Sequence, residues 1–399
     1  LGAYQQAYNA FAHAHELDRT NVPVLAAMVQ LALMSDNFDL ADDQAKSLAL
    51  LAPDNPVVTL VGGYDAYRSG DNDKAEAAAD SILANSPDDS FAKVLKAKVL
   101  VGRGRFDEAA SLLEAQHQIT PDDQGALRGL TAIYQFRDDW RNLARIQTDA
   151  HRLKPRDFTV AVAAIDAWLR AGNVAAASQL SRPYLVRSSN PRAVESVLES
   201  WATHAPPGAI LPDAVKLASA LSGDARVSFG NYFNRVRRPD LTAALLGGSR
   251  LPVTQANARL NAVVAQSIAL RGNSAAAKRL FDLVLEREPD QAEALRGRCA
   301  LEASNGMTKQ AIIDAERLVT ISPDSAEDRL LLAHANRVSG NNAEALRTLW
   351  QAFQDLPGDE QVFSSLRSAL ASTGDLDGQR RVDDEFADRR KAKLTKDLV

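Results

Sequence analysis

The amino-acid sequence predicts an all-α fold, an α/α solenoid of stacked helix–turn–helix repeats, and three observations support this prediction. Prolines recur at one fixed interval, glycines recur at the same interval between them, and the stretches that they bound carry apolar side chains at helical spacing. Two helix-breaking positions in each interval indicate two helices per repeat. The prolines are Pro53, Pro87, Pro121 and Pro155, then Pro289, Pro323 and Pro357. The glycine positions hold Gly70, Gly104 and Gly172, with Asp138 where one glycine is missing, then Gly272, Gly306, Gly340 and Gly374.

The first helix of each repeat is expected to end at the glycine position, because glycine adopts the left-handed conformation of a helix C-terminus without a Cβ penalty. An Asp or Asn follows most of these positions, as Asp71 follows Gly70, and its side chain can accept a hydrogen bond from the next helix. Proline cannot continue the second helix, and residues such as Asn55, Asp89 and Asp123 then cap the helix after it.

The second helices carry an apolar stripe at positions i, i+3, i+4 and i+7, for example Phe106, Ala109, Ala110 and Leu113. Each stripe begins on a small residue, which lets neighbouring helix axes approach to the short end of about 8–10 Å. The alanines that share this phase are Ala41, Ala75, Ala109, Ala177, Ala277, Ala311 and Ala345.

These features resemble the tetratricopeptide repeat, a helix–turn–helix unit with Gly and Tyr in the first helix, Ala in the second and Pro at the end. In this chain Gly63, Tyr67, Ala75 and Pro87 carry the resemblance, and the interval between the prolines is that of the family. An irregular helical domain with chance spacing is the alternative, but it leaves the phased prolines and glycines unexplained. The resemblance implies a superhelix whose concave groove is lined by the first helices and binds a partner protein.

The sequence divides into three predicted regions. Residues 1–191 form a regular block that begins with a second helix lacking its partner (1–21), so further sequence, such as a signal peptide, an anchor or more repeats, is expected upstream. Residues 192–257 are expected to hold two degenerate repeats with long turns at 204–212 and 247–253, in preference to a linker or an inserted enzyme. Residues 258–399 form a second regular block that ends in a capping helix containing Leu376, Val382 and Phe386.

Composition and motifs disfavour several classes of function. The net charge of −5 argues against a role in nucleic-acid binding, and no apolar run is long enough to span a membrane. The single cysteine, Cys299, excludes an internal disulfide and is expected to be a small buried residue. The histidines lack zinc-type spacing, and no residue is assigned to catalysis, to a cofactor or to a metal. The composition suggests a bacterial protein of the periplasm or the cytoplasm, with no oligomeric state assigned.

Three kinds of function are compatible with this sequence. A protein-binding scaffold needs no catalytic group and accounts for the whole repeat pattern. An assembly or regulatory module is the alternative, as part of an envelope export complex or of an enzyme whose other module lies upstream. An autonomous enzyme is permitted by the fold alone, but no site supports it.

The groove-facing stripe of the first helices, as the resemblance implies it, supplies the candidate binding residues. Counted from residues 56, 90 and 124, this stripe contains Tyr64, Tyr67, Arg68, Lys98, Arg128 and Phe136. Arg68, Lys98 and Arg128 are equally spaced at slightly less than one repeat, so successive helices present a cation about one helical turn lower each time. The sequence therefore predicts a groove for an acidic or backbone-exposed peptide, with ordinary solvated charges as the alternative.

A carboxylate clamp of the kind found in one tetratricopeptide subfamily is not expected. That clamp uses a Lys and an Asn four residues apart on such helices. The corresponding pairs in this chain are Ala26/Gln30, Leu60/Tyr64 and Val94/Lys98.

Overall fold

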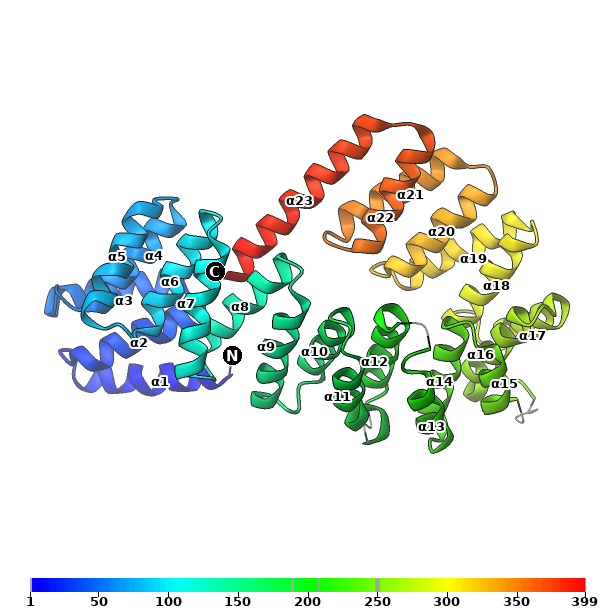
Figure 1. Cartoon of the computed structure of the whole chain (residues 1–399), viewed down its shortest axis with the longest axis horizontal. Coiled ribbons are helices and arrows are strands. Elements are labelled where there is room, and N and C mark those ends of the chain that lie inside the picture. The colour runs from blue at the N-terminus through cyan, green and yellow to red at the C-terminus, as the bar shows by residue number, and fades with distance from the viewer. Residues whose placement is uncertain (1, 188–189, 207, 248–251, 399) are drawn as a thin grey trace. The chain divides into compact units, whose positions relative to one another are not determined.

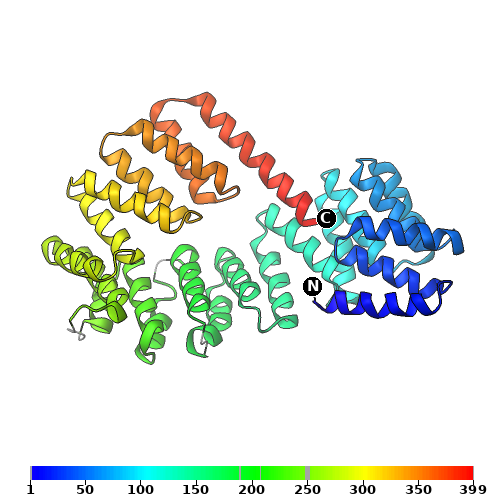
Figure 2. The ribbon, with the colours of Figure 1, turned by 180° about the vertical axis from the view of Figure 1, so that it is seen from behind.

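The computed structural model describes residues 2–187, 190–206, 208–247 and 252–398, and all regular elements within these ranges are helical. The helices fall into two compact units, one made of residues up to Lys154 together with those from Ala392, and the other of Pro155–Lys391. Figures 1 and 2 show the helices of each unit packed side by side, consecutive helices running in opposite directions. The all-α solenoid predicted from the sequence is thereby confirmed. No described helix is long and apolar enough to cross a membrane.

Unit 1 contains α1 (Gly2–Leu17) followed by four regular helix pairs. The first helices of these pairs have 13 residues each and are α2 (Val22–Met34), α4 (Pro56–Arg68), α6 (Ser90–Gly102) and α8 (Gln124–Phe136). The second helices have 14 residues each and are α3 (Phe38–Leu51), α5 (Asn72–Asn85), α7 (Phe106–Ile119) and α9 (Trp140–Leu153). The period and the register follow the proline and glycine positions of the sequence.

Unit 2 begins with the pair α10 (Phe158–Arg170) and α11 (Val174–Arg187). The middle of the chain supplies α12 (Pro191–His204), α13 (Leu211–Ser219), α14 (Gly223–Arg235), α15 (Pro239–Leu246) and the 3₁₀ turn η1 (Gln255–Asn257). Regular pairs then resume with α16 (Ala258–Leu270), α17 (Ser274–Arg287), α18 (Ala292–Ser304), α19 (Thr308–Ile321), α20 (Ala326–Val338) and α21 (Asn342–Asp355). The last pair is α22 (Glu360–Thr373) and the longer α23 (Leu376–Leu398), which runs from unit 2 into the residues grouped with unit 1.

The turns have the conformations that the sequence predicts. All seven glycines of the repeating position have positive φ, between 71° and 88°, and Asp138 has φ 55° in the place of the missing one. Asp71 accepts a hydrogen bond from Lys74 N at 3.1 Å, and Asp89 accepts one from Ala92 N at 2.8 Å, so both cap the following helix. Asn341 differs, because it precedes α21 without a capping hydrogen bond from its side chain.

Small residues allow close helix packing, as predicted. The seven phased alanines are all buried. Gly63 of α4 shows how tight the crossings are, since a Cβ atom added there would lie 2.6 Å from Leu95 Cδ2 and 2.9 Å from Ala78 Cβ. Cys299 is fully buried, and burial raises the pKa of its thiol to about 12.

The middle of the chain has two short helices and an aromatic core. Helix α13 has nine residues and α15 has eight, against 14 in the regular second helices. Trp201 packs edge-on against Tyr232 with ring centroids 6.1 Å apart, and its indole N–H donates to Ser181 Oγ at 2.9 Å. The expected long turn at 247–253 lies largely outside the described residues. The division at 191/192 and 257/258 stays a prediction. The two compact units are divided after Lys154.

The apolar stripe of the capping helix α23 begins later than expected. Val382 is fully buried, and Phe386 stacks on Phe363 with ring centroids 4.1 Å apart. Leu376 is 63% exposed, because it is the first residue of the helix and precedes the part that packs on α22. Arg389 also contacts α21, where its guanidinium lies 4.3 Å from the Phe353 ring centroid.

Candidate partner-binding pocket in unit 1

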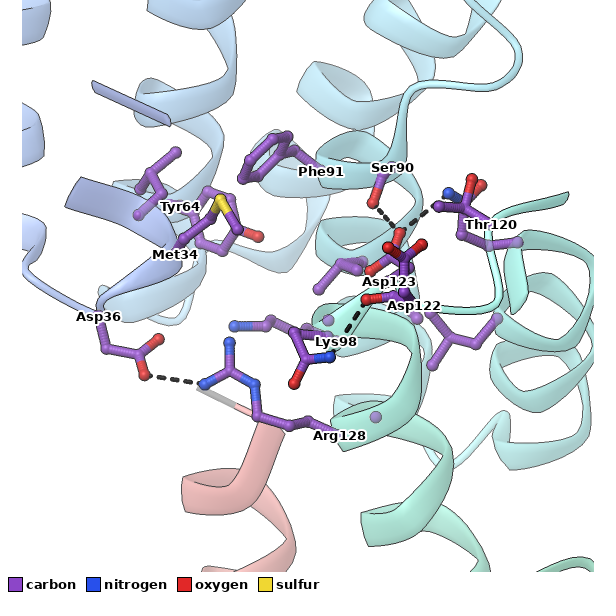
Figure 3. A pocket seen from close by; sticks show the side chains of 18 of the residues that line it. Met34, Asp36, Tyr64, Ser90, Phe91, Lys98, Thr120, Asp122, Asp123 and Arg128 are labelled. Atoms are coloured by element: carbon purple, nitrogen blue, oxygen red, sulfur yellow. Dashed lines mark hydrogen bonds and ion pairs between the residues drawn. The ribbon is translucent and has the colours of Figure 1, made fainter. Parts of the chain in front are cut away.

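A pocket of about 520 Å³ lies in unit 1 against the first helices α2, α4, α6 and α8 (Figure 3). Its apolar wall consists of Leu33, Met34, Phe91, Val94, Ala97 and Leu113. Its charged residues are Asp36, Asp88, Lys98, Asp122, Asp123 and Arg128. Apolar walls with a few placed polar groups are typical of binding sites, and this volume lies in their usual range.

Three of the six predicted groove residues line this pocket, namely Tyr64, Lys98 and Arg128. Lys98 Nζ lies over the Tyr64 ring, 5.0 Å from its centroid, which is a favourable cation–π distance. Arg128 Nη1 is 3.0 Å from Asp36 Oδ2. Figure 3 shows the side chains of Asp36 and Arg128 directed toward one another beside Lys98. Two of the three predicted cations are therefore brought together.

Lys98 is a buried cation, with only 4% of its surface exposed. Burial lowers the pKa of its ammonium group from 10.5 to about 8, because the charged form loses hydration. The negative charge of Asp36 opposes this lowering of the pKa, and the positive charge of Arg128 adds to it. Burial also raises the pKa of the Tyr64 hydroxyl, so that Tyr64 stays neutral beneath the ammonium group.

The opposite end of the pocket is acidic. Asp123 caps α8 by accepting from Ala126 N at 3.0 Å, and it also accepts from the Ser90 hydroxyl and from Gln116 Nε2. Asp88 pairs with Lys93, whose Nζ lies 3.2 Å from Asp88 Oδ1. Asp122 is exposed, and its carboxylate has no ion pair among the described residues. This end therefore presents negative charge to the pocket.

The other three predicted residues lie outside this pocket. The Arg68 guanidinium lies over the Phe38 ring, 5.0 Å from its centroid, and Nη1 is 3.6 Å from Asp65 Oδ1. Tyr67 is half-buried and packs against the core of the first repeats. Phe136 packs against Phe106 with ring centroids 5.2 Å apart. The sequence correctly placed these residues on first helices, but neighbouring side chains direct them elsewhere.

Asp36 is the residue of the pocket that sequence reasoning missed. It lies in the turn between α2 and α3, one repeat before Gly70, and has φ 56°. It therefore occupies the position at which later repeats have glycine, just as Asp138 does. The sequence shows this departure from the glycine pattern. It could have pointed to Asp36, because the turn itself does not require a carboxylate at this position.

Comparison with known proteins agrees with the repeat geometry. Residues 60–188 match the family model described as Psidin, N-terminal TPR repeats region. Residues 60–188 are therefore similar to tetratricopeptide repeats. A search of the curated proteins finds no match to the sequence.

Several solved structures are similar to this chain. The structure of Naa15/Naa10 bound to HypK-THB has a TM-score of 0.41 and 12% identity, covering 92% of this chain and 68% of the other. Yeast Tom70 has a TM-score of 0.41 and 11% identity, with 94% of each chain covered. The Cut9–Hcn1 structure of the APC/C has a TM-score of 0.37 and 11% identity, covering all of this chain and 93% of the other. These likenesses are confined to the repeated helical fold.

Proposed function

We propose that the chain is a protein-interaction scaffold and that the pocket of unit 1 holds an extended segment of a partner protein. Tetratricopeptide-repeat proteins generally bind proteins or peptides through their first helices and act by binding rather than by catalysis. The pocket lies on those helices in unit 1 and combines an apolar wall with three residues of the predicted groove stripe. We expect the partner segment to place an apolar side chain against Phe91 and Val94.

The observation that carries this proposal is the presence of two cationic side chains, Lys98 and Arg128, on the lining of the pocket. The Arg128 side chain is about half exposed to solvent. A guanidinium group that reaches solvent forms charge-assisted hydrogen bonds with carboxylates, so this end of the pocket favours a segment that carries an acidic group.

The test uses a random peptide library displayed on phage and selected against the whole chain. Selected peptides are then measured by fluorescence anisotropy against the parent and against a Lys98→Met, Arg128→Gln double variant. We expect the double variant to bind at least about tenfold more weakly, because a charge-assisted hydrogen bond contributes about 1.5–3 kcal/mol. Its affinity should also depend less on salt concentration.

Arg68→Gln is the matched control, since Arg68 is also a cation of the predicted stripe but lies outside the pocket. We expect this variant to bind the selected peptides as the parent does across the salt series. Equal losses in Arg68→Gln and in the double variant would contradict binding at this pocket. Unchanged binding by the double variant would also contradict binding at this pocket.

A further inference from the structure

Unit 2 contains ion pairs between first helices that are not neighbours in the stack. Adjacent first helices are joined by pairs such as Arg296 of α18 and Asp328 of α20, whose Nε and Oδ1 atoms are 2.6 Å apart. Such contacts are expected in an array in which each repeat packs on the next. Arg170 of α10 instead pairs with Glu360 of α22 at 3.2 Å, although the two residues are 190 positions apart in the sequence. This contact joins the first helix pair of unit 2 to the last.

A second ion pair crosses the same unit. Arg235 of α14 has its Nη2 atom 3.6 Å from Oε1 of Glu327 on α20, although α16 and α18 lie between these helices in the stack. Figures 1 and 2 show the reason, because the first helices of unit 2 follow an arc that places α20 and α22 opposite α10 and α14. The two ion pairs therefore span the concave side of this arc.

Both ion pairs across the arc are accessible to water. The side chain of Glu360 is 56% exposed, and that of Glu327 is 50% exposed. Ion pairs in such surroundings contribute little net free energy, because water solvates the separated charges nearly as well and dissolved salt screens their attraction. These two contacts can therefore break and form again at small cost.

The repeat architecture allows the arc itself to open and close. The curvature of a solenoid results from a small rotation between each repeat and the next, so small changes at several interfaces add up between α10 and α22. Weak interactions between opposite sides of the arc can then shift the balance between a closed and an open form. Ion pairs that exist only when the sides meet shift this balance toward the closed form.

We propose that the ion pairs Arg170–Glu360 and Arg235–Glu327 form a latch, which holds unit 2 in a closed arc and releases it as ionic strength rises. Closure keeps α20 and α22 beside α10 and α14 and so narrows access to the concave side of unit 2. Release widens that access. The latch lies in unit 2 and does not depend on the pocket of unit 1, so either proposal can fail without the other.

The latch is tested by measuring the distance across the arc between two nitroxide labels with double electron–electron resonance. The labels are attached through Ala163→Cys on α10 and Ser368→Cys on α22, both of which are exposed positions. The native Cys299 is fully buried, so we expect it to stay unlabelled. Distances are compared at low salt and at about 1 M salt, where the Debye length falls to about 3 Å.

We expect the Glu327→Gln, Glu360→Gln double variant to show a longer mean distance than the parent at low salt. Glutamine keeps the size of glutamate and removes only its charge. Loss of each ion pair should raise the ratio of open to closed molecules by up to about fivefold, the range of exposed ion pairs. The distance in the parent should lengthen at high salt toward that of the variant, and the variant should respond little to salt.

Asp290→Asn is the matched control. Asp290 forms an exposed ion pair with Arg317 at 2.7 Å, but this pair joins the neighbouring helix pairs of α17 and α19 and does not cross the arc. We expect the control to follow the parent at both salt concentrations.

Equal distances in the parent and the double variant at low salt would overturn the latch, because neighbour packing alone would then fix the arc. The same lengthening in Asp290→Asn as in the double variant would also overturn it, since loss of any carboxylate would then have the same effect. A parent distance that does not lengthen at high salt would overturn release by ionic strength.

Discussion

Lys98 is the residue at which burial and charge oppose each other most directly. Its ammonium group is buried against Tyr64, with Arg128 and Asp36 among the charged groups near it, and its pKa is about 8. Below this pH the lysine is charged in both the folded and the unfolded chain, and the folded state bears the cost of burying the charge. Between about pH 8 and pH 10.5 the unfolded chain binds more protons than the folded one, so this cost falls as pH rises.

Lys98→Met should therefore be more stable than the parent at pH 7, by about 1–3 kcal/mol, since each pKa unit corresponds to about 1.4 kcal/mol and local relaxation and the lost cation–π contact reduce the total. The advantage should shrink by pH 10. Urea unfolding of parent and variant at both pH values measures it, with Lys96→Met as the control for losing a lysine from the same helix. An advantage of equal size at both pH values would show that burial of the charge is not its cause.

Within a single helix, α4 contains two adjacent glycines in opposite environments. Gly62 is exposed, and a Cβ atom added there would meet nothing within 4 Å. Gly63 faces α5 and α6, and an added Cβ would come within 2.9 Å of Ala78 Cβ, which cannot rotate away. Helix propensity favours alanine at both positions, but packing permits it only at the first.

Gly62→Ala should stabilise the protein by about 0.5–1 kcal/mol, the usual gain when alanine replaces a glycine within a helix. Gly63→Ala should destabilise it by about 1–3 kcal/mol, because overpacking of a closed crossing outweighs that gain. Chemical unfolding of the two variants and of the parent measures these changes in stability. Stabilisation by both substitutions would mean that the crossing of α4 with its neighbours is looser than described.

At the scale of the whole molecule, the two compact units consist of repeats that pack mainly on adjacent repeats. In such arrays free energy is approximately a sum of repeat and neighbour contributions, so a local defect opens its own region first. Gly63 lies in unit 1, and Gly297 of α18 lies in unit 2, where an added Cβ would meet the Phe281 ring at 2.4 Å. An alanine at either position therefore introduces a packing defect into one unit only.

Gly63→Ala should accelerate amide hydrogen exchange in α2–α7 and leave α16–α21 near the parent rates, and Gly297→Ala should do the reverse. Hydrogen exchange followed by mass spectrometry resolves these segments in the intact chain. If either variant accelerates exchange evenly along all described helices, the chain unfolds as one cooperative block.

Local signals explain why the helix register was predictable. Gly104 has positive φ, and Asp89 accepts from an amide three residues away, so each acts through contacts that the adjacent sequence contains. The candidate site was predictable only in part. Tyr64, Lys98 and Arg128 share the pocket, but Arg68 turns to Phe38 and Asp65, because a position on a stripe does not fix a long side chain's rotamer.

The sequence by itself determined the repeat length, the position of each helix end and the buried phase of the alanines, since these depend on backbone preferences and capping within a few residues. Only the tertiary structure decided that Asp36 meets Arg128 across 92 residues and that Lys98 is buried between Tyr64 and the two charges. These contacts depend on how each repeat is rotated on the next. That rotation results from the summed packing of many side chains, so no short stretch of sequence encodes it.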